Sequence, residues 1–302
     1  MSILSLPFIA DTAARLFGKA GALAPKSRRQ FPEIQGDTYV VSVPTRHGDV
    51  ACTIYNPPAT SGTRVAVYVN VHGGGFVIAY PEQDDPWCRY LAAHAKVAAV
   101  NVDYAIAPRS RFPIAVEQVY DVLMWASSAD REWDGGRLCV GGQSAGGSLA
   151  AGAARLALET GGPQIALQVL HYPVLDLVTP AKDKHGARGK PFLRPWMGEI
   201  FTTAYIPEPD RRRDRLASPA WGPNGDGIKG IAPAVVITAE RDRLRNEAAT
   251  YARKLDAVGC LVEYRDVPGV DHGYNIIGDS EDITRQMYDF IVDHVVRASS
   301  KT

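Results

Sequence analysis

The sequence has no net charge and lacks long apolar runs. Lys and Arg together number 33, as do Asp and Glu, so the 302-residue chain has a formal net charge of zero. A chain without a charge excess produces no field that attracts nucleic acid or an anionic membrane. It also has no stretch of about 18 or more apolar residues, the length that spans a bilayer. The composition therefore predicts neither a nucleic-acid partner nor an integral membrane span.

Cysteine is scarce as well. The four cysteines are far apart, and no two of them form a C-x-x-C pair. Cys52 and Cys139 lie in strand-like runs and Cys260 opens another, where cysteine usually serves as a small buried hydrophobe. We therefore expect structural thiols in a reducing compartment, the cytoplasm, and neither a disulfide framework nor a metal site.

The N-terminal segment 2–23 is apolar enough to raise the question of a signal peptide. It lacks a basic start, and Asp11, Arg15 and Lys19 interrupt the apolar stretch. Its apolar residues instead follow helical spacing, which predicts an amphipathic helix that covers part of the fold. The alternative is that this helix makes weak contact with a lipid surface. The residues at helical spacing are Phe8, Ile9, Ala13, Leu16 and Phe17.

From residue 38 onward, strand-like and helix-like patterns alternate. Strands are expected at 39–44, 50–55, 65–71, 97–103, 137–141, 165–172, 234–239 and 261–267. Helices are expected at 86–94, 114–127, 145–158, 245–257 and 281–297. The first two strands flank a turn-like segment and predict an antiparallel hairpin. From residue 65, apolar β-branched strands between helices predict an α/β fold with a parallel sheet covered on both faces.

One segment breaks this alternation. Residues 179–218 are rich in charge and proline, contain an apolar helical stripe, and end in a cluster of arginines. About forty residues between two sheet strands is far more than a connection needs. We therefore expect an insertion that forms a lid or cap over a site. The arginine cluster is expected to be a solvated face of it, with an anion site as the alternative.

Two glycine-framed motifs, each directly after a strand-like run, indicate acyl-transfer chemistry. The first is His-Gly-Gly-Gly-Phe at 72–76, and the second is Gly-Gln-Ser-Ala-Gly at 142–146. A serine at a sharp strand-to-helix turn is exposed for attack, so Ser144 is the predicted nucleophile. Backbone N–H groups of Gly74, Gly75 and Ala145 are predicted to stabilise the oxyanion. No Lys-Ser or Lys-Thr follows the first motif, which argues against a phosphate loop.

The base and its orienting acid are expected after the serine, in the order acid then histidine. His272 lies in a turn-rich loop directly after the strand 261–267 and is the predicted base. Asp242 follows the strand 234–239 and is the main candidate acid, with Glu240 and Asp271 as alternatives. His72 lies upstream of the serine, so we expect it to have a structural hydrogen-bonding role.

Six segments in one order carry a resemblance to a known family. They are 72–76, 103–108 (Asp-Tyr-Ala-Ile-Ala-Pro), 142–147, 172–176 (Tyr-Pro-Val-Leu-Asp), 242–245 (Asp-Arg-Leu-Arg) and 272–274 (His-Gly-Tyr). From about residue 40 to the end, the chain resembles the bacterial hormone-sensitive-lipase family of α/β-hydrolases. It departs from that pattern at Gln143, where the family usually has Asp, and at Ala105 and Arg109.

The resemblance implies an α/β-hydrolase fold with an eight-stranded, mostly parallel sheet and a helical cap. The cap would combine the N-terminal segment 1–40 with the insertion at about 179–218, and 41–302 would form the catalytic domain. It further implies hydrolysis of short- to medium-chain acyl esters without a cofactor. A homodimer through the edge strand 261–267 is compatible with the resemblance.

Two other functions remain open from the sequence: an amide or formamide hydrolase with the same triad, and a non-catalytic small-molecule receptor. A receptor on this fold usually lacks a triad member, and this chain retains all three. The substrate pocket is expected to draw on aromatic and apolar residues near the first motif and in the insertion, with plain core packing as the alternative for each. The candidates are Phe76, Tyr80, Tyr104, Trp196, Met197 and Phe201.

Overall fold

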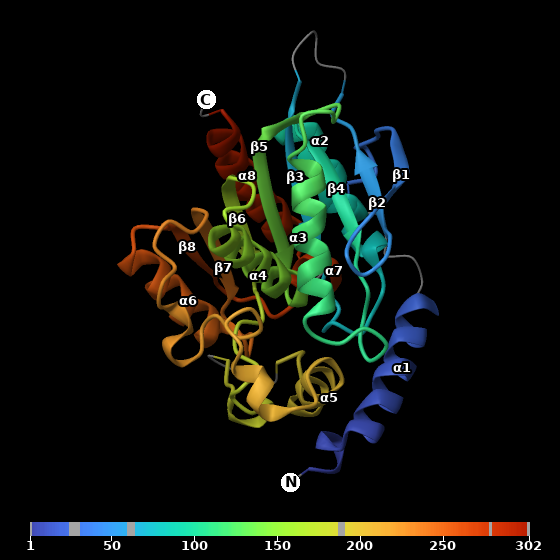
Figure 1. The fold of residues 1–302 in the computed structure, drawn as a ribbon, viewed down its shortest axis with the longest axis vertical. Helices are drawn as coiled ribbons and strands as arrows, with labels where there is room; N and C mark the ends of the chain where they lie inside the picture. Colours follow the sequence, from blue (N-terminus) through green and yellow to red (C-terminus); the bar gives the residue numbers. More distant parts are fainter. Residues whose placement is uncertain (1, 24–30, 59–63, 187–190, 278–279, 301–302) are drawn as a thin grey trace.

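Eight strands form one twisted sheet at the centre of the molecule (Figure 1). The computed structural model describes residues 2–23, 31–58, 64–186, 191–277 and 280–300. The strands are ordered β1-β2-β4-β3-β5-β6-β7-β8 across the sheet. Their bounds are β1 Thr38–Val43, β2 Val50–Tyr55, β3 Ala66–Val71, β4 Ala98–Asp103, β5 Asp134–Gln143, β6 Ile165–His171, β7 Ala234–Ala239 and β8 Leu261–Val267.

The pairing of the strands confirms the expected mixed sheet. β1 pairs with β2 as an antiparallel hairpin with Val41 opposite Cys52, and β2 is also antiparallel to β4. Every pair from β4 through β3 to β8 is parallel. The carboxyl ends of six strands therefore meet at one edge of the sheet, where a site on parallel strands forms.

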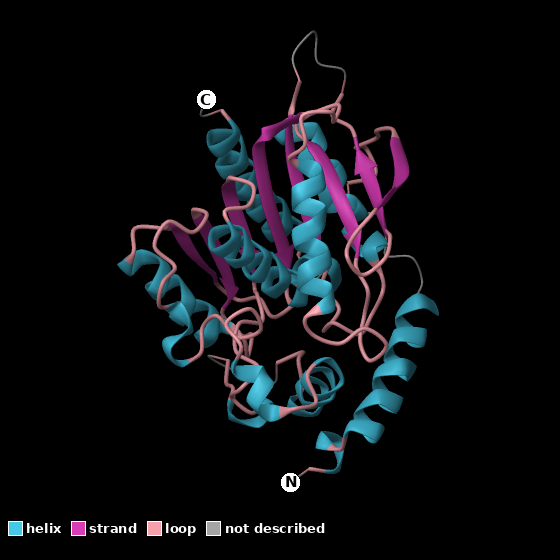
Figure 2. Cartoon of the chain, viewed as in Figure 1, coloured by secondary structure: helices cyan, strands magenta, loops and turns pink. Residues whose placement is uncertain are grey.

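Helices cover both faces of this sheet, as the apolar strands require (Figure 2). One apolar layer contains residues of α3, α4 and α6, and the other contains residues of α2 and α8. Figure 1 shows α3 and α4 in front of the strands, with α2 and α8 behind them. The helices that cover the sheet are α2 Asp85–Ala95, α3 Ile114–Ala126, α4 Ala145–Thr160, α6 Arg245–Ala257 and α8 Glu281–Ser299.

Three further helices lie toward the carboxyl edge. Helix α1 (Pro7–Leu23) packs against α5 (Pro195–Tyr205), and both lie below the sheet in Figure 1. The ring of Phe17 on α1 contacts the rings of Trp196 and Phe201 on α5, with centroids 5.7 and 5.6 Å apart. The short helix α7 (Tyr274–Ile277) follows the loop after β8. The expected N-terminal helix and the helix of the insertion are thus packed together.

The segment 1–40 does not all lie with α1. Phe31 is buried against Tyr90 of α2 and Tyr288 of α8, and β1 already begins at Thr38. Residues 31–40 therefore pack with the sheet and its helices. Residue 1, residues 24–30 of the same segment, and 187–190 of the expected insertion lie outside the described residues.

All four cysteines, Cys52, Cys88, Cys139 and Cys260, are buried free thiols. Burial raises the pKa of the Cys52 and Cys139 thiols to about 12. Among the helices that the structure describes, none has the length and apolar character needed to cross a membrane.

Candidate active site

Ser144 occupies the sharp turn between β5 and α4. Its backbone φ is 56° and its ψ is −120°, a conformation that residues other than glycine rarely adopt. The Ser144 N–H donates to the carbonyl of His171 at 2.9 Å, and its own carbonyl accepts from Val174 and Ser148. Hydrogen bonds to two neighbouring segments therefore hold this strained backbone, as is common at functional sites.

Glycines let the end of β3 lie against this turn. A Cβ atom on Gly142 would meet the carbonyl oxygen of Val71 at 2.5 Å, and one on Gly146 would overlap that same oxygen. Only a residue without a side chain fits at either position, because real Cβ contacts are not this short. The glycines of the Gly-Gln-Ser-Ala-Gly motif thus bring the serine turn and the segment at 72–75 together.

His272 links Ser144 to Asp242. Its Nε2 lies 2.9 Å from Ser144 Oγ, and its Nδ1 lies 2.7 Å from Asp242 Oδ2. The three residues follow β5, β7 and β8, and their exposed fractions are 8%, 0% and 6%. The other carboxylate oxygen of Asp242 accepts the Leu244 N–H at 3.0 Å, which fixes the carboxylate. Chain order and strand ends predicted this trio, and the structure places the three side chains in one hydrogen-bonded line.

The two alternative acids are engaged elsewhere. Glu240 Oε2 accepts the Gly269 N–H at 2.7 Å and therefore stabilises the loop before His272. Asp271 accepts the N–H of His272 with one oxygen and the N–H of Phe192 with the other. Asp271 thereby connects the histidine loop to the inserted segment, and neither acid contacts the imidazole ring in the structure.

The glycine loop after β3 presents free N–H groups. Gly74 has φ of +127° and Gly75 has φ of +60°, both in the region that favours glycine. In the described part of the chain, the N–H groups of these two glycines have no hydrogen-bond acceptor. The N–H of Ala145 belongs to the first residue of α4, where a helix leaves its amides unbonded. Gly74, Gly75 and Ser144 line one cavity, and Ala145 directly follows Ser144 in the sequence.

His72 does not take part in the line of three. Its Nδ1 bonds the Gly73 carbonyl at 2.6 Å, and its ring stacks on Tyr104 with centroids 4.3 Å apart. Burial lowers the pKa of His72 to about 4. The ring is therefore a neutral packing group, in the role expected from the sequence. His171 is likewise buried, with its pKa lowered to about 3 by burial and by His272, and it bonds the Tyr274 hydroxyl.

A cavity of about 280 Å³ opens beside Ser144 and His272. Most of its lining side chains are apolar, and α1, α5 and the inserted segment supply its outer wall. The charged lysines and arginines in this lining are Lys184, Arg194 and Arg243, and no carboxylate lines it among the described residues. The apolar lining residues include Phe17, Phe76, Ile78, Val174, Leu177, Phe192, Leu193, Met197, Phe201, Leu244, Ile276 and Ile277.

The six pocket residues named from the sequence divide into two groups. Phe76, Met197 and Phe201 line the cavity, although Phe76 also stacks on Tyr205 at 4.0 Å and is almost fully buried. Tyr80, Tyr104 and Trp196 are not among the described residues of the lining. Tyr80 directly precedes the short helix Pro81–Asp84, and Trp196 packs against Phe17.

Tyr104 lies outside the expected pocket because its side chain packs against His72. Its hydroxyl donates to the His72 carbonyl at 3.0 Å, and the side chain is 1% exposed. The residue thus supports the glycine loop at 72–75. Leu177 and Ile276 also line the cavity but were not singled out from the sequence. Their apolar character is the one sequence signal for this role, and core residues share it.

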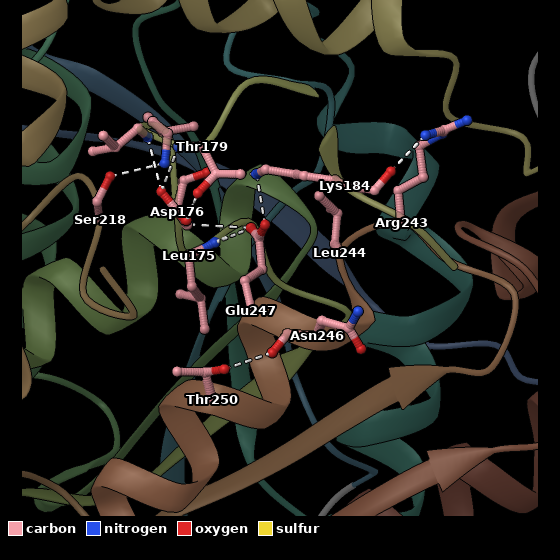
Figure 3. A network of polar contacts seen from close by, with 12 residues as sticks. Leu175, Asp176, Thr179, Lys184, Ser218, Arg243, Leu244, Asn246, Glu247 and Thr250 are labelled. Atoms are coloured by element: carbon pink, nitrogen blue, oxygen red, sulfur yellow. Dashed lines mark hydrogen bonds and ion pairs between the residues drawn. The ribbon is translucent and has the colours of Figure 1, made fainter. Parts of the chain in front are cut away.

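A buried ion pair attaches the inserted segment to the region of Asp242 (Figure 3). Lys184 Nζ lies 2.5 Å from Glu247 Oε2 on α6, and it also donates to the Asp176 carbonyl. Glu247 Oε1 accepts the N–H groups of Leu175 and Asp176. Burial raises the pKa of Glu247, and the Lys184 ammonium opposes that effect. The start of the insertion and the start of α6 are therefore joined at a desolvated, fully hydrogen-bonded carboxylate.

Arg243 reinforces the same junction. Its Nη1 donates to the Lys184 carbonyl, and Figure 3 shows its guanidinium directed away from Glu247. Thr179, Lys184 and Arg243 line both the cavity beside Ser144 and a second, polar cavity of about 230 Å³. These three residues therefore form the partition between the two cavities.

Metal ligands do not gather at this site. Within the described ranges, the structure contains no group of three or more His, Cys, Asp or Glu side chains placed to hold a metal ion. The reactive groups that the geometry offers are a hydroxyl, an imidazole, a carboxylate and backbone amides.

Comparison with known proteins places the chain in a family. A family model described as alpha/beta hydrolase fold matches residues 68–276. The chain is 33% identical to carboxylesterase NlhH of Mycobacterium tuberculosis over 230 residues, which covers 75% of this chain and 71% of that protein. It is 32% identical to an ethyl acetate hydrolase of Pseudomonas putida over 276 residues, which covers 89% and 84%.

Solved structures agree with this assignment. An esterase of Pyrobaculum calidifontis superposes with a TM-score of 0.82 at 29% identity, covering 97% of this chain and 94% of that one. The carboxylesterase EstE1, cloned from a metagenomic library, superposes with a TM-score of 0.81 at 28% identity, covering 100% of both chains. The chain belongs to the hormone-sensitive-lipase family of serine ester hydrolases, within the α/β-hydrolase superfamily.

Proposed function

We propose that the protein is a carboxylesterase that hydrolyses short- to medium-chain acyl esters with Ser144, His272 and Asp242. The observation that carries this proposal is the continuous hydrogen-bonded line from Ser144 Oγ through His272 to Asp242. The relatives named carboxylesterase and ethyl acetate hydrolase support the same reaction class.

In the proposed reaction, Ser144 Oγ attacks the ester carbonyl while His272 Nε2 takes its proton. The N–H groups of Gly74, Gly75 and Ala145 stabilise the tetrahedral oxyanion. His272 then protonates the leaving alcohol, which leaves an acyl group on Ser144. Water, deprotonated by His272, attacks this acyl-enzyme, and His272 returns the proton to Ser144 Oγ as the acid leaves. Asp242 stabilises the imidazolium without taking its proton.

The cavity supports the proposed acyl range. Its volume of about 280 Å³ is near the lower limit of ordinary ligand pockets, which is about 300 Å³. We propose that α1 and the inserted segment form the cap over this cavity, because Phe17 and Phe201 contact each other and both line it. A series of p-nitrophenyl esters of increasing chain length tests the range, and a maximum at long chains would contradict it.

Substitution of the nucleophile tests the reaction itself. Ser144→Ala should lower turnover of p-nitrophenyl butyrate by several orders of magnitude, to the residual that the oxyanion donors provide. Ser148→Ala is the matched control, since Ser148 is a buried serine one turn further along α4. Near-normal hydrolysis by Ser144→Ala would overturn the proposal.

An organophosphonate distinguishes an esterase from a receptor. The wild-type protein should gain the mass of one phosphonyl group on Ser144, whereas a non-catalytic receptor would remain unmodified. Paired ester and anilide substrates with the same acyl group address the amide-hydrolase alternative. The ester should react faster, and faster cleavage of the anilide would favour that alternative.

The surface supports two proposals about partners. Phe8 and Leu16 on α1 are 81% and 63% exposed, and we propose that this face makes weak contact with lipid. Strand β8 is at the edge of the sheet, with Val262 48% exposed, and we propose a homodimer through this strand. Vesicle co-sedimentation and light scattering test these two proposals. The buried free thiols support a location in the reducing cytoplasm.

A further inference from the structure

A buried row of polar side chains lies behind the serine turn. Asp84, at the end of the short helix Pro81–Asp84, is 1% exposed. Its Oδ2 accepts from Asn70 Nδ2 at 2.8 Å, and its Oδ1 accepts from Gln143 Nε2. Gln143 Oε1 in turn accepts from Asn275 Nδ2 at 2.9 Å and from the Tyr172 hydroxyl at 2.6 Å. None of these side chains has a part in the proposed reaction steps.

The donors and acceptors in this row fix its direction. Both carboxyl oxygens of Asp84 accept a hydrogen bond, one from Asn70 and the other from Gln143, so the NH₂ group of Gln143 faces Asp84 and its oxygen faces Asn275. Asn275 fits this orientation, because its amide nitrogen donates to Gln143 and to the Tyr288 hydroxyl. The carboxylate of Asp84 therefore determines which end of the Gln143 amide meets the histidine side of the site.

Two members of the row lie close in sequence to the proposed reacting groups. Gln143 directly precedes Ser144, and Asn275 lies three residues after His272. The ring of Tyr172, whose hydroxyl bonds Gln143, packs against the His272 ring with centroids 4.8 Å apart.

The helix that carries Asp84 also contacts the glycine loop at 72–75, whose N–H groups are the proposed oxyanion donors (the oxyanion loop). Gln83 Nε2 donates to the carbonyl of Gly73 at 3.0 Å. A single turn of helix thus contacts the oxyanion loop through Gln83 and the serine turn through Asp84.

We propose that Asp84 and Gln143 form a positioning pair that orients the His272 loop toward Ser144 through Asn275 and Tyr172. This inference rests on the proposed roles of Ser144 and His272. Asp84 touches neither substrate nor a reacting atom and acts through Gln143. The pair determines where the imidazole lies when Ser144 attacks, so its loss lowers kcat and leaves KM nearly unchanged. A displacement of about 1 Å at a reacting group can cost about a hundred-fold in rate.

Two single substitutions, and then their combination, test the pair. Gln143→Glu places two carboxylates against each other, which disfavours their joint ionisation and removes the donor to Asp84. We expect kcat for p-nitrophenyl butyrate to fall on the order of a hundred-fold. Asp84→Asn replaces the carboxylate with a side chain that can present either end, and kcat should fall about ten-fold.

The double variant Asp84→Asn/Gln143→Glu restores one amide and one carboxylate with their polarity reversed. Asn at 84 can donate to Glu at 143, and that carboxylate can still accept from Asn275 and Tyr172. Its kcat should therefore recover at least about ten-fold over Gln143→Glu alone. The rate at which an organophosphonate labels Ser144 should follow the same order across the four proteins, because it reports the nucleophile directly.

Gln168→Met is the matched control. Gln168 is a fully buried glutamine in β6 whose amide donates to the Ala232 carbonyl, outside the row. This variant should lose thermal stability without loss of kcat. Equal effects of Gln168→Met and Asp84→Asn on kcat at equal loss of stability would overturn the proposal.

The remaining outcomes are also decisive. Wild-type kcat in folded Asp84→Asn and Gln143→Glu would reject the pair, as would a folded double variant no faster than Gln143→Glu. If Gln143→Glu does not fold, Asp84→Asn against Gln168→Met decides the question alone. A wild-type protein that cleaves no ester would instead reject the proposed function, so the two failures are distinguishable.

Discussion

The reacting groups and the outer wall of the cavity are built in different ways. Ser144, Asp242 and His272 stand on turns directly after strands, and all three are buried and hydrogen-bonded. The outer wall comes from α1 and the inserted segment, where the lining residue Phe192 is 49% exposed. The proposed reacting groups thus stand at the ends of sheet strands, while a more exposed layer borders the cavity. Substitutions in the two regions should therefore differ in kind.

The largest effect is expected for the acid. Asp242→Asn keeps the shape but favours the wrong imidazole tautomer, so kcat should fall by about 10⁴-fold. Glu240→Gln is the matched control, because Glu240 lies in the same loop as Asp242 and its carboxylate accepts from the Gly269 amide in the loop after β8. Steady-state hydrolysis of p-nitrophenyl butyrate measures both. A severe loss in Glu240→Gln with a mild one in Asp242→Asn would move the acid to Glu240.

The wall should respond in substrate preference instead. Phe201 lines the cavity and packs on Phe17, so Phe201→Ala enlarges the space for an acyl chain. We expect the ratio of kcat/KM for octanoate over butyrate esters to rise about ten-fold, since a methylene in an apolar pocket is worth roughly 1–3 kcal/mol. Trp196→Ala, outside the described lining, should change the ratio less. An unchanged ratio in Phe201→Ala would place the acyl chain elsewhere.

Buried ionisable groups make the stability of the inner region depend on pH. The pKa of His72 is lowered to about 4 by burial, so between about pH 4 and 6.5 only the unfolded chain binds this proton. The free energy of unfolding then falls as the solution is acidified. Burial raises the pKa of Asp84 to about 7, against the hydrogen bonds from Asn70 and Gln143. Protonated Asp84 therefore adds to the free energy of unfolding at low pH, and this contribution is lost as pH rises toward about 7.

Two substitutions separate these opposite contributions. His72→Asn should make the acid-induced loss of stability smaller, and Asp84→Asn should make it larger, each by about 1 kcal/mol or more. Urea unfolding at about pH 5 and about pH 7 measures both slopes. Gln168→Met, which removes no ionisable group, should leave the slope unchanged. Parallel shifts in the two variants would contradict the opposite signs.

The smallest effect concerns the charge of the substrate. Lys184, Arg194 and Arg243 line the cavity without a carboxylate beside them in the described lining, although Glu247 neutralises Lys184 from behind. A butyrylcholine ester should therefore react several-fold more slowly than its neutral 3,3-dimethylbutyl isostere. Arg243→Met should reduce this difference, and salt should reduce it in the wild type. A preference for the choline ester would contradict the cationic lining.

The sequence predicted the parts that depend on local pattern and chain order. All eight strands fall close to their expected positions, because apolar alternation and turn residues are local signals. Strand β5 is longer than expected, since its glycines read as turn signals. Gly142, one residue beyond the expected end, is held in the strand by pairing with Val71 and Leu170, and a side chain there would not fit against Val71 and Gly146. Tertiary packing overrides local preference at this strand.

Contacts between distant segments lay beyond such patterns. Asp84 and Gln143 are 59 residues apart, and Gln143 and Asn275 are 132 apart, so no local period connects them. The Lys184–Glu247 pair likewise joins the inserted segment, which precedes β7 in the sequence, to α6, which follows β7. Tyr104 was expected to line the pocket, with core packing as the alternative, and its hydroxyl instead donates to the His72 carbonyl. Proximity in sequence to a motif does not give a residue's orientation.

The four buried thiols can report unfolding of the protein through their reaction with thiol reagents. Cys52 lies in β2, Cys88 in α2 and Cys139 in β5, and Cys260 directly precedes β8, so together they sample both layers and most of the sheet. Thiol reagents attack the thiolate, and burial raises the pKa of the Cys52 and Cys139 thiols to about 12. Alkylation in the native state should therefore wait for opening of the surrounding structure. A single cysteine placed on α1 or α5 could be labelled selectively, without first removing the natural four.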